Sequence, residues 1–302
     1  MSHAIIIPIY CENRNTINLC NELQNFGAEH IVVVNDGLNP KSEYFNELTS
    51  IGCHLVHLKN NNGKGASLKA GIKYAHDNLY NITGYITCDA DGQHTANDVM
   101  KISRMLDLRN GSLILGKRDY KKSKMPINIR IGNRLSSAYF KVITGKSCKD
   151  TQTGLRGIPA FLYDTVMKTK GSRFDFEMNF LTKCADMRVP FYFVNIIADC
   201  SNCSSNFRLM IKDTYLIYRT PLRFATASIG CTIIDLVLFT IFAYILPSHM
   251  FFNIMLATLM ARVVSGGINF LINRKVIFGN TDNGAKQALR FFILFFCIMC
   301  AS

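Results

Sequence analysis

The chain lacks several features that would assign it to a common class of protein. It has 21 acidic side chains against 34 basic ones, which gives a net charge of +13 over 302 residues. Residues 1–9 have no basic start and only a short apolar core, so no secretory signal is expected there. The 11 cysteines have no framework spacing, and the C-x-x-C at residues 200–203 has no second pair. We therefore expect reduced thiols in a cytosolic setting, without a structural zinc.

Standard phosphate-binding fingerprints are also missing. Residues 62–66 read Asn-Gly-Lys-Gly-Ala, which has neither the spacing of a P-loop nor the length of a dinucleotide-binding fingerprint. The segment fits a glycine-permitted helix start with a solvated lysine. It fits equally a helix N-terminus at which Lys64 approaches a diphosphate. Both interpretations stay open on this segment alone.

The chain does contain an apolar segment that leads directly into paired carboxylates. Residues 84–88 are followed by Asp89, Asp91, Gln93 and His94. In open α/β sheets, ligands bind where the strands end at their carboxyl side. Carboxylate oxygens at that edge suit Mg²⁺ or Mn²⁺, which bridge to the phosphates of a substrate. For an isolated Asp-x-Asp, a merely solvated acidic turn is the alternative interpretation.

Strand-like and helical patterns alternate over the first 220 residues. Strands are predicted at residues 4–9, 30–34, 53–58, 84–88 and 112–116. Helices are predicted at residues 13–26, 62–75, 96–108 and 127–143. This alternation predicts an α/β fold with a mostly parallel, doubly wound sheet. Glu12, Asp36 and Asp89 would then share the ligand-binding edge.

Basic side chains are concentrated between residues 116 and 134. They are Lys117, Arg118, Lys121, Lys122, Lys124, Arg130 and Arg134. Such a run is usually a solvated face, but a basic amphipathic helix can also anchor on anionic lipid. We do not expect nucleic-acid binding, because basic residues that flank membrane segments explain the net charge more simply.

From Leu222 onward the chain is mostly apolar. Residues 222–246 and 250–273 are each long enough to cross a hydrocarbon core of about 30 Å, and residues 288–302 begin a third such stretch. Buried helices of a soluble protein are the alternative. Lysine and arginine flank the hairpin but are absent from its turn, which predicts a cytoplasmic location for the first 220 residues. Asp235 and Arg262 fall near the middle of the two spans, where they could pair structurally or serve a function.

Several motifs occur in an order that resembles a known family. They are Pro8–Glu12, Asn35–Gly37, Asn62–Gly65, Asp89–His94, Arg130–Asn133, Asp150–Gly154 and Ser205–Thr214. Together they resemble the family 2 glycosyltransferases of the polyprenyl-phosphate type, similar to dolichyl-phosphate mannose synthase and undecaprenyl-phosphate glucosyltransferases. Cys11 and Asn35 stand where that family more often has Asn and Asp. Residues 222–302 resemble a GtrA-like membrane domain, which normally has four spans, of which two and a fraction are expected here.

The resemblance implies a GT-A catalytic domain at residues 1–220, with a juxtamembrane segment at about 205–221, followed by the membrane domain at 222–302. It implies a multi-pass membrane enzyme that moves a hexose, with inversion, from GDP-mannose or UDP-glucose to a polyprenyl phosphate. The lipid-linked sugar would serve cell-envelope glycan synthesis or protein glycosylation. The alternatives are a transferase of the same fold that acts on a polysaccharide or protein, and a non-enzymatic component of lipid-carrier translocation. The membrane domain could also support a homo-oligomer.

The resemblance also implies roles for single residues. A Mg²⁺ or Mn²⁺ ion would be held by Asp89, Asp91 and Gln93. The nucleotide sugar would be bound by Pro8, Tyr10, Glu12, Asp36, Lys64, Asp89, Ala90, Asp91, Arg208 and Lys212. The lipid phosphate would be bound by Arg118, Arg130 and Arg134, since a guanidinium matches a phosphate in a bidentate way. The predicted catalytic set is Asp89, Asp91, Gln93, Arg118 and Arg130.

Overall fold

The computed structural model of the chain describes residues 2–119, 127–197, 207–246 and 251–272, without the side chains of residues 128, 207–225 and 251. The chain divides into two compact units, Met1–Asp213 and Thr214–Ser302. This division falls inside one long helix, α8 (Phe207–Ile245), and the domain boundary expected at residues 220–222 stays a prediction. Each unit is described by itself.

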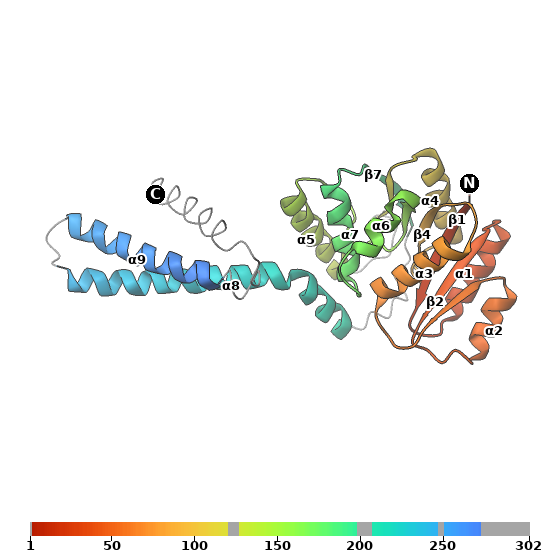
Figure 1. Cartoon of the computed structure of the whole chain (residues 1–302), viewed down its shortest axis with the longest axis horizontal. Coiled ribbons are helices and arrows are strands. Elements are labelled where there is room, and N and C mark those ends of the chain that lie inside the picture. The colour runs from red at the N-terminus through yellow and green to blue at the C-terminus, as the bar shows by residue number, and fades with distance from the viewer. Residues whose placement is uncertain (1, 120–126, 198–206, 247–250, 273–302) are drawn as a thin grey trace. The chain divides into compact units, whose positions relative to one another are not determined.

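The first unit is built on a seven-stranded sheet (Figure 1). Its strands are β1 (Ser2–Ile9), β2 (His30–Asp36), β3 (His54–Leu58), β4 (Ile82–Thr87), β5 (Leu113–Arg118), β6 (Arg156–Pro159) and β7 (Phe191–Ile196). Their spatial order is β3-β2-β1-β4-β6-β5-β7, and β6 alone runs antiparallel to its neighbours in this sheet. The mostly parallel sheet predicted from the sequence is confirmed.

Helices connect the strands and cover both faces of the sheet. They are α1 (Arg14–Asn25), α2 (Glu43–Ser50), α3 (Lys64–Asn78), α4 (Ala96–Leu108), α5 (Ile127–Thr144), α6 (Tyr163–Lys168) and α7 (Asp175–Asp186), with a short 3₁₀ turn at Ala160–Leu162. Three starts are capped by side chains that accept a backbone N–H: Asn13 before α1, Ser42 before α2 and Thr95 before α4. The sequence predicted α1, α3, α4 and α5 but not α2, α6 or α7.

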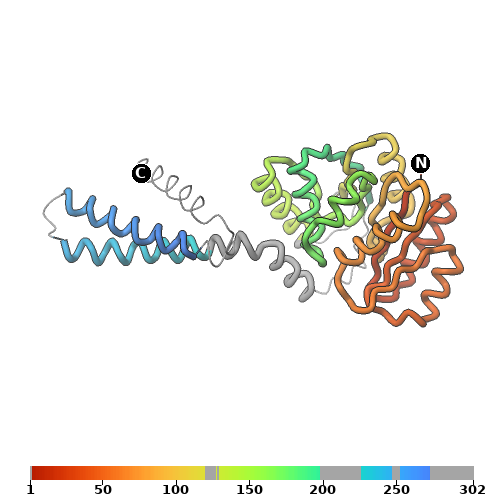
Figure 2. Tube along the Cα trace, in the orientation of Figure 1, coloured from red at the N-terminus to blue at the C-terminus, as the bar shows by residue number. Residues whose placement is uncertain are grey.

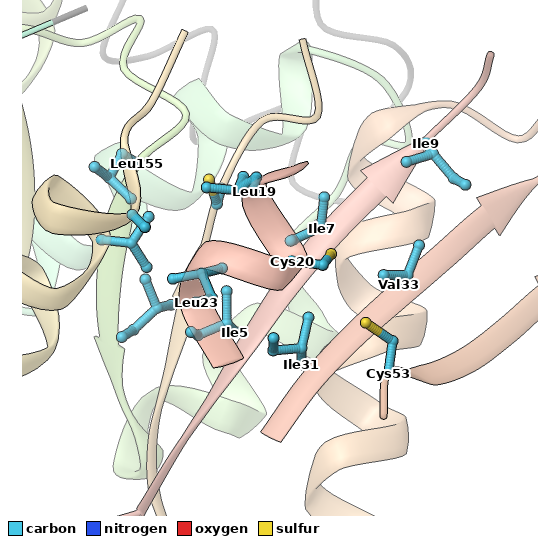
Figure 3. Packing of buried hydrophobic residues seen from close by; sticks show 14 of the residues in the cluster. Ile5, Ile7, Ile9, Leu19, Cys20, Leu23, Ile31, Val33, Cys53 and Leu155 are labelled. Carbon is cyan, nitrogen blue, oxygen red and sulfur yellow. The ribbon is translucent and has the colours of Figure 1, made fainter. Parts of the chain in front are cut away.

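Opposite faces of β1 pack on different helices, as a doubly wound sheet requires. Ile5 and Ile7 join a buried cluster that includes Leu23 of α1 (Figure 3). Ile6 points to the other face, where a Cβ added to Gly71 of α3 would lie only 2.5 Å from its Cγ2. Because both faces are covered, the central strands read as continuous apolar runs instead of alternating ones.

The antiparallel strand β6 was not predicted, and it positions the site. It lies between β4 and β5, with Arg156 opposite both Thr87 and Leu115. The Thr87 hydroxyl donates a hydrogen bond of 2.7 Å to the carbonyl oxygen of Gly154. The segment that precedes β6, residues 150–154, is thereby held beside the end of β4.

The second unit contains the later part of α8 and α9 (Phe251–Ile272), which form an antiparallel pair (Figure 2). Thr226–Ile245 and Phe252–Ile272 are long and apolar enough to cross a membrane, with mean hydropathies of 2.0 and 1.6. Asp235 and Arg262 line one cavity of about 240 Å³ between these helices. The Ser265 hydroxyl donates a 2.7 Å hydrogen bond to the Asp235 carboxylate. The predicted turn and third span lie outside the described residues.

The buried cluster generates a prediction for Leu23, which has no exposed surface. Truncation by Leu23→Ala removes buried methyl groups and leaves a cavity, so it should lower the free energy of unfolding by about 2–5 kcal/mol. Leu108→Ala, at a leucine that is 74% exposed, should change it by no more than about 0.5 kcal/mol. Urea titration of the full-length protein in detergent, followed by circular dichroism, measures both. Equal midpoints for the two variants would contradict this packing.

Candidate active site

The carboxyl ends of β1, β2 and β4 meet at one edge of the sheet. In the parallel register, Ile9 lies opposite Asn35, and Ile6 lies opposite Thr87. The polar residues that follow these strands are therefore neighbours, as the sequence predicted. This edge holds the candidate site.

Asp36, at the end of β2, fixes the start of α3. Its two carboxylate oxygens accept the backbone N–H groups of Asn62 and Gly63 at 2.8 and 2.9 Å. Gly63 has a φ of +93°, a conformation that disfavours any residue with a Cβ. The glycine in this motif is thus required by the turn, and the turn presents Lys64 at the first position of α3.

Lys64 is not a solvated lysine, because its side chain is only 15% exposed. Its ammonium lies 2.6 Å from Asp89 Oδ1 and 3.2 Å from Glu177 Oε2 of α7. Burial lowers the pKa of Lys64, but the two carboxylates outweigh burial and raise it above its usual value. The lysine is therefore a permanent cation inside the site.

Asp89 and Asp91 lie in opposite electrostatic environments. Burial raises the pKa of Asp89, but Lys64 and His94 outweigh it and hold that pKa well below its usual range. The His94 Nε2 atom lies 3.6 Å from Asp89 Oδ2. Burial and the nearby Asp89 charge raise the pKa of Asp91, against the Gln93 hydrogen bonds that lower it. Nearby positive groups therefore balance the negative charge of Asp89, whereas they balance little of the negative charge of Asp91.

The site has the chemistry for a hard divalent cation. Asp91 Oδ1 accepts the backbone N–H of Gln93 at 3.1 Å, and its Oδ2 accepts the Gln93 side-chain amide. Gln93 presents its amide nitrogen to Asp91, so ligation by its oxygen requires the amide to rotate. Within the described part of the chain, no group of three or more His, Cys, Asp or Glu side chains could hold a metal. A typical Mg²⁺ site has one or two protein carboxylates as ligands, and oxygens of the substrate phosphates complete the coordination of the ion.

Gly154 makes close approach to Asp89 feasible. A Cβ at this position would overlap the Asp89 carboxylate. The glycine that ends the motif at residues 150–154 therefore has a physical reason, which is to let this segment pass directly over the acidic group.

Arg118 has a different partner from the one that the sequence suggested. Its guanidinium donates to both oxygens of Asp150, with Nε–Oδ2 and Nη2–Oδ1 distances of 2.7 and 2.8 Å. Both side chains are buried. Binding of a lipid phosphate by Arg118 would require its release from Asp150, and breaking a buried ion pair is costly. The pair fixes residues 150–154 against the end of β5, and the phosphate-binding role stays a prediction.

Sequence reasoning missed two residues that complete the site. Arg156 is buried and donates to the carbonyl oxygens of Thr151, Thr153 and Glu177 at 2.9–3.2 Å. Glu177 also contacts Lys64, so the two residues join the 150–154 segment, α7 and the lysine. The available signal was the polar cluster at residues 173–177 and an arginine directly after the 150–154 motif.

The remaining predicted residues lie farther from the centre or outside the described side chains. Tyr10 is 61% exposed, and its pKa is raised by burial, Cys11, Asp91 and Asp89. Glu12 lines a pocket of about 480 Å³ at the starts of α1 and α2. Pro8 is buried in β1, and the carbonyl oxygen of Ala90 accepts a hydrogen bond from the Thr16 hydroxyl. Arg130 and Arg134 lie on α5. The side chains of Arg208 and Lys212 are not described.

The fold and this acidic edge together define a protein of the GT-A glycosyltransferase class. Glucosyl-3-phosphoglycerate synthase of Mycobacterium tuberculosis, solved with Mn²⁺, UDP-glucose and glycerol 3-phosphate, superposes with a TM-score of 0.55 at 11% identity. The match covers 72% of this chain and 77% of that one, and it shows a shared fold.

Residues 4–164 match the model of glycosyl transferase family 2, and residues 223–302 match that of the GtrA/DPMS transmembrane domain. The chain belongs to glycosyltransferase family 2 and carries a GtrA-like membrane domain. An uncharacterized Methanocaldococcus jannaschii protein is 32% identical over 59% of this chain and 73% of its own length. The UDP-N-acetylglucosamine–dolichyl-phosphate N-acetylglucosaminyltransferase of Methanococcus voltae is 29% identical over 50% and 67%.

The Lys64–Asp89 ion pair generates a second prediction. Lys64→Met keeps the length of the side chain but leaves Asp89 and Glu177 without their cation, which should lower the free energy of unfolding by about 3–5 kcal/mol at pH 7. Lys73→Met, also on α3, removes only an exposed pair with Asp77 and should leave the stability close to that of the wild type. Thermal unfolding in detergent measures both. A Lys64→Met protein as stable as the Lys73→Met protein would refute the structural role of the pair.

The depressed pKa of Asp89 generates a third prediction, on acid stability. The pKa of Asp89 is lower in the folded protein than in the unfolded chain, so ionised Asp89 stabilises the fold fully above its unfolded-state pKa of about 4. This stabilisation is lost as the pH falls through the pKa of Asp89 in the folded protein. In Lys64→Met the pKa of Asp89 is no longer held down. The stability difference between wild type and Lys64→Met should therefore narrow below about pH 4. Unfolding midpoints measured from pH 7 to pH 2 test this, and a constant difference would disagree with it.

Proposed function

We propose that the protein transfers a sugar from a nucleotide diphosphate sugar to a polyprenyl phosphate, with inversion at the anomeric carbon. One observation carries the proposal: Asp89, paired with Lys64 at 2.6 Å, and the neighbouring Asp91 lie at the sheet edge of a chain that also has a GtrA/DPMS membrane domain. The name of the Methanococcus voltae relative, a dolichyl-phosphate N-acetylglucosaminyltransferase, supports a lipid phosphate acceptor. It also adds UDP-N-acetylglucosamine to UDP-glucose and GDP-mannose as candidate donors.

The reaction needs a site that stabilises a departing nucleoside diphosphate. Asp91 would hold a Mg²⁺ or Mn²⁺ ion, with Asp89 and Gln93 beside it. When bound, the ion neutralises charge that develops on the diphosphate. The Mn²⁺ and UDP-glucose in the Mycobacterium tuberculosis structure support a divalent metal.

The side chains of the protein do the remaining work. Asp36 and Gly63 orient the start of α3, where the helix dipole favours negative charge, and Lys64 adds a fixed cation there. Lys64 also lowers the pKa of Asp89, so this carboxylate stays ionised and keeps its negative charge in the site. The acceptor phosphate is already an anion at neutral pH, so the site needs positioning groups more than a general base. Arg130 and Arg134 are our candidates for that task, with Arg208 and Lys212 near the nucleotide phosphates.

The membrane domain would keep the catalytic unit at the bilayer, where the phosphate of the acceptor lies. Basic residues flank the predicted hairpin, and its turn has none, which supports a multi-pass protein with a cytoplasmic catalytic unit. A nucleotide-sugar donor fits that location, because both substrates can then reach the site from the same side.

A donor screen tests the proposal. Membranes that carry the protein would receive Mg²⁺ or Mn²⁺, a short polyprenyl phosphate, and labelled UDP-N-acetylglucosamine, UDP-glucose or GDP-mannose in turn. We expect label in an organic-extractable lipid with one donor, and its loss with EDTA. Asp91→Asn should lower the rate about hundredfold or more, because a preorganised charge is removed.

Asp77→Asn is the matched control, since Asp77 is half-exposed and pairs with Lys73 at the surface. It should keep the wild-type rate. The proposal is wrong if no donor labels a lipid while the protein still binds nucleotide, or if Asp91→Asn transfers sugar as the control does.

A further inference from the structure

Two buried cysteines from distant parts of the chain lie in contact in the core of the first unit. Cys20 is on α1, Cys53 directly precedes β3, and both are free thiols. The Cys20 thiol donates a hydrogen bond to the Cys53 sulfur, and Figure 3 shows the two side chains directed toward one another. A buried cysteine usually acts as a small apolar side chain, but two sulfur atoms in contact need little movement to form a bond.

Regular structure holds both thiols in place. The backbone N–H of Cys53 donates to the carbonyl oxygen of Leu48 at 3.1 Å, which fixes it to the last turn of α2. Cys20 lies on the buried face of α1, together with Leu19 and Leu23. The contact between the thiols is therefore a product of the fold, because neither cysteine is on a free end of the chain.

The two thiols differ in the way that stepwise oxidation requires. Cys53 is 6% exposed, whereas Cys20 has no exposed surface. The hydrogen bond from Cys20 outweighs burial and lowers the pKa of Cys53, while the same bond and burial raise the pKa of Cys20. The thiolate is the reactive form of cysteine, so Cys53 reacts first with an oxidant, and Cys20 lies beside it as the second thiol.

We propose that Cys20 and Cys53 form a reversible disulfide when the protein is exposed to a peroxide. The Cys53 thiolate attacks one oxygen of hydrogen peroxide, which breaks the O–O bond, leaves a sulfenic acid and releases water after proton uptake. The Cys20 sulfur then attacks the Cys53 sulfur, so that the S–S bond forms, the S–O bond breaks and a second water leaves. The pair of thiols loses two electrons and two protons, and the peroxide takes up both. A dithiol reductant reverses the reaction by thiol–disulfide exchange.

The disulfide would act on the support of the candidate site. At the start of α1, the Asn15 side-chain amide donates to the carbonyl oxygen of Asp91 at 3.5 Å, and the Thr16 hydroxyl donates to that of Ala90 at 3.0 Å. A bond from α1 to the residue before β3 would therefore fix the helix that supports the acidic loop. The inference does not depend on the proposed reaction, because no step uses a sugar donor or an acceptor.

Peptide mapping of the full-length protein in detergent tests the bond directly. The reduced protein would be treated with hydrogen peroxide, blocked with N-ethylmaleimide and digested with trypsin. Trypsin places Cys20 and Cys53 on separate peptides, residues 15–41 and 42–59, and neither peptide has another cysteine. We expect mass spectrometry to find these two peptides joined after peroxide, and separate after a further treatment with dithiothreitol.

Oxidation should also stabilise the protein, because a disulfide restricts the unfolded chain. The midpoint of thermal unfolding should rise by roughly 5–10 °C in the peroxide-treated wild type. Cys20→Ala and Cys53→Ala should each show no rise, since one partner is missing. Cys184→Ala removes another buried thiol, on α7, and is the matched control. It should keep both the joined peptides and the rise.

Three results would overturn the proposal. The first is that the two peptides stay separate at a peroxide concentration that oxidises the exposed thiol of Cys11. The second is sulfinic acid at Cys53 without joined peptides, which would show that Cys20 does not complete the reaction. The third is an equal rise of the unfolding midpoint in the wild type, Cys20→Ala and Cys53→Ala, which would assign the stabilisation to oxidation elsewhere.

Discussion

The buried contact between Lys64 and Asp89 is the interaction on which the rest of the site depends. It joins the start of α3 to the end of β4 across 2.6 Å, and Glu177 brings in α7 through the same ammonium. Each neighbouring feature serves that contact: Asp36 shapes the turn before Lys64, and Gly154 leaves room for the Asp89 carboxylate. A cation and two carboxylates at low exposure are stable only as a set, because removing one leaves the others buried without compensation.

The same contact gives the two neighbouring carboxylates, Asp89 and Asp91, different electrostatic environments. Lys64 and His94 compensate Asp89, so its ionised form persists, while the pKa of Asp91 is raised. A cation that enters the site therefore gains most by binding near Asp91. On the proposed function, the protein itself compensates Asp89 of the Asp-x-Asp motif, and Asp91 is left for the ligand, a distinction that spacing alone does not reveal.

The sequence predicted the parts of the fold that local patterns encode. Apolar runs indicated β1, β2 and β4, and the carboxyl edge that these strands share predicted that Asp36 lies near Asp89. Strand β6 was missed because it has only four residues, ends in proline, and takes its place by pairing with β4 and β5 over long range. For the same reason the sequence left Lys64 open between solvent and ligand, and it did not predict that Arg118 pairs with Asp150.

The measurement that tests the central claim most directly is Mn²⁺ binding to the full-length protein, followed by the electron paramagnetic resonance of the free ion in the presence of UDP. The account predicts that Asp91→Asn weakens binding by more than about tenfold, since even residues behind the metal ligands cost that much. Asp77→Asn, on the exposed face of α3, should bind as the wild type does. Unchanged Mn²⁺ affinity in Asp91→Asn would contradict the assignment of Asp91 as the metal-facing carboxylate.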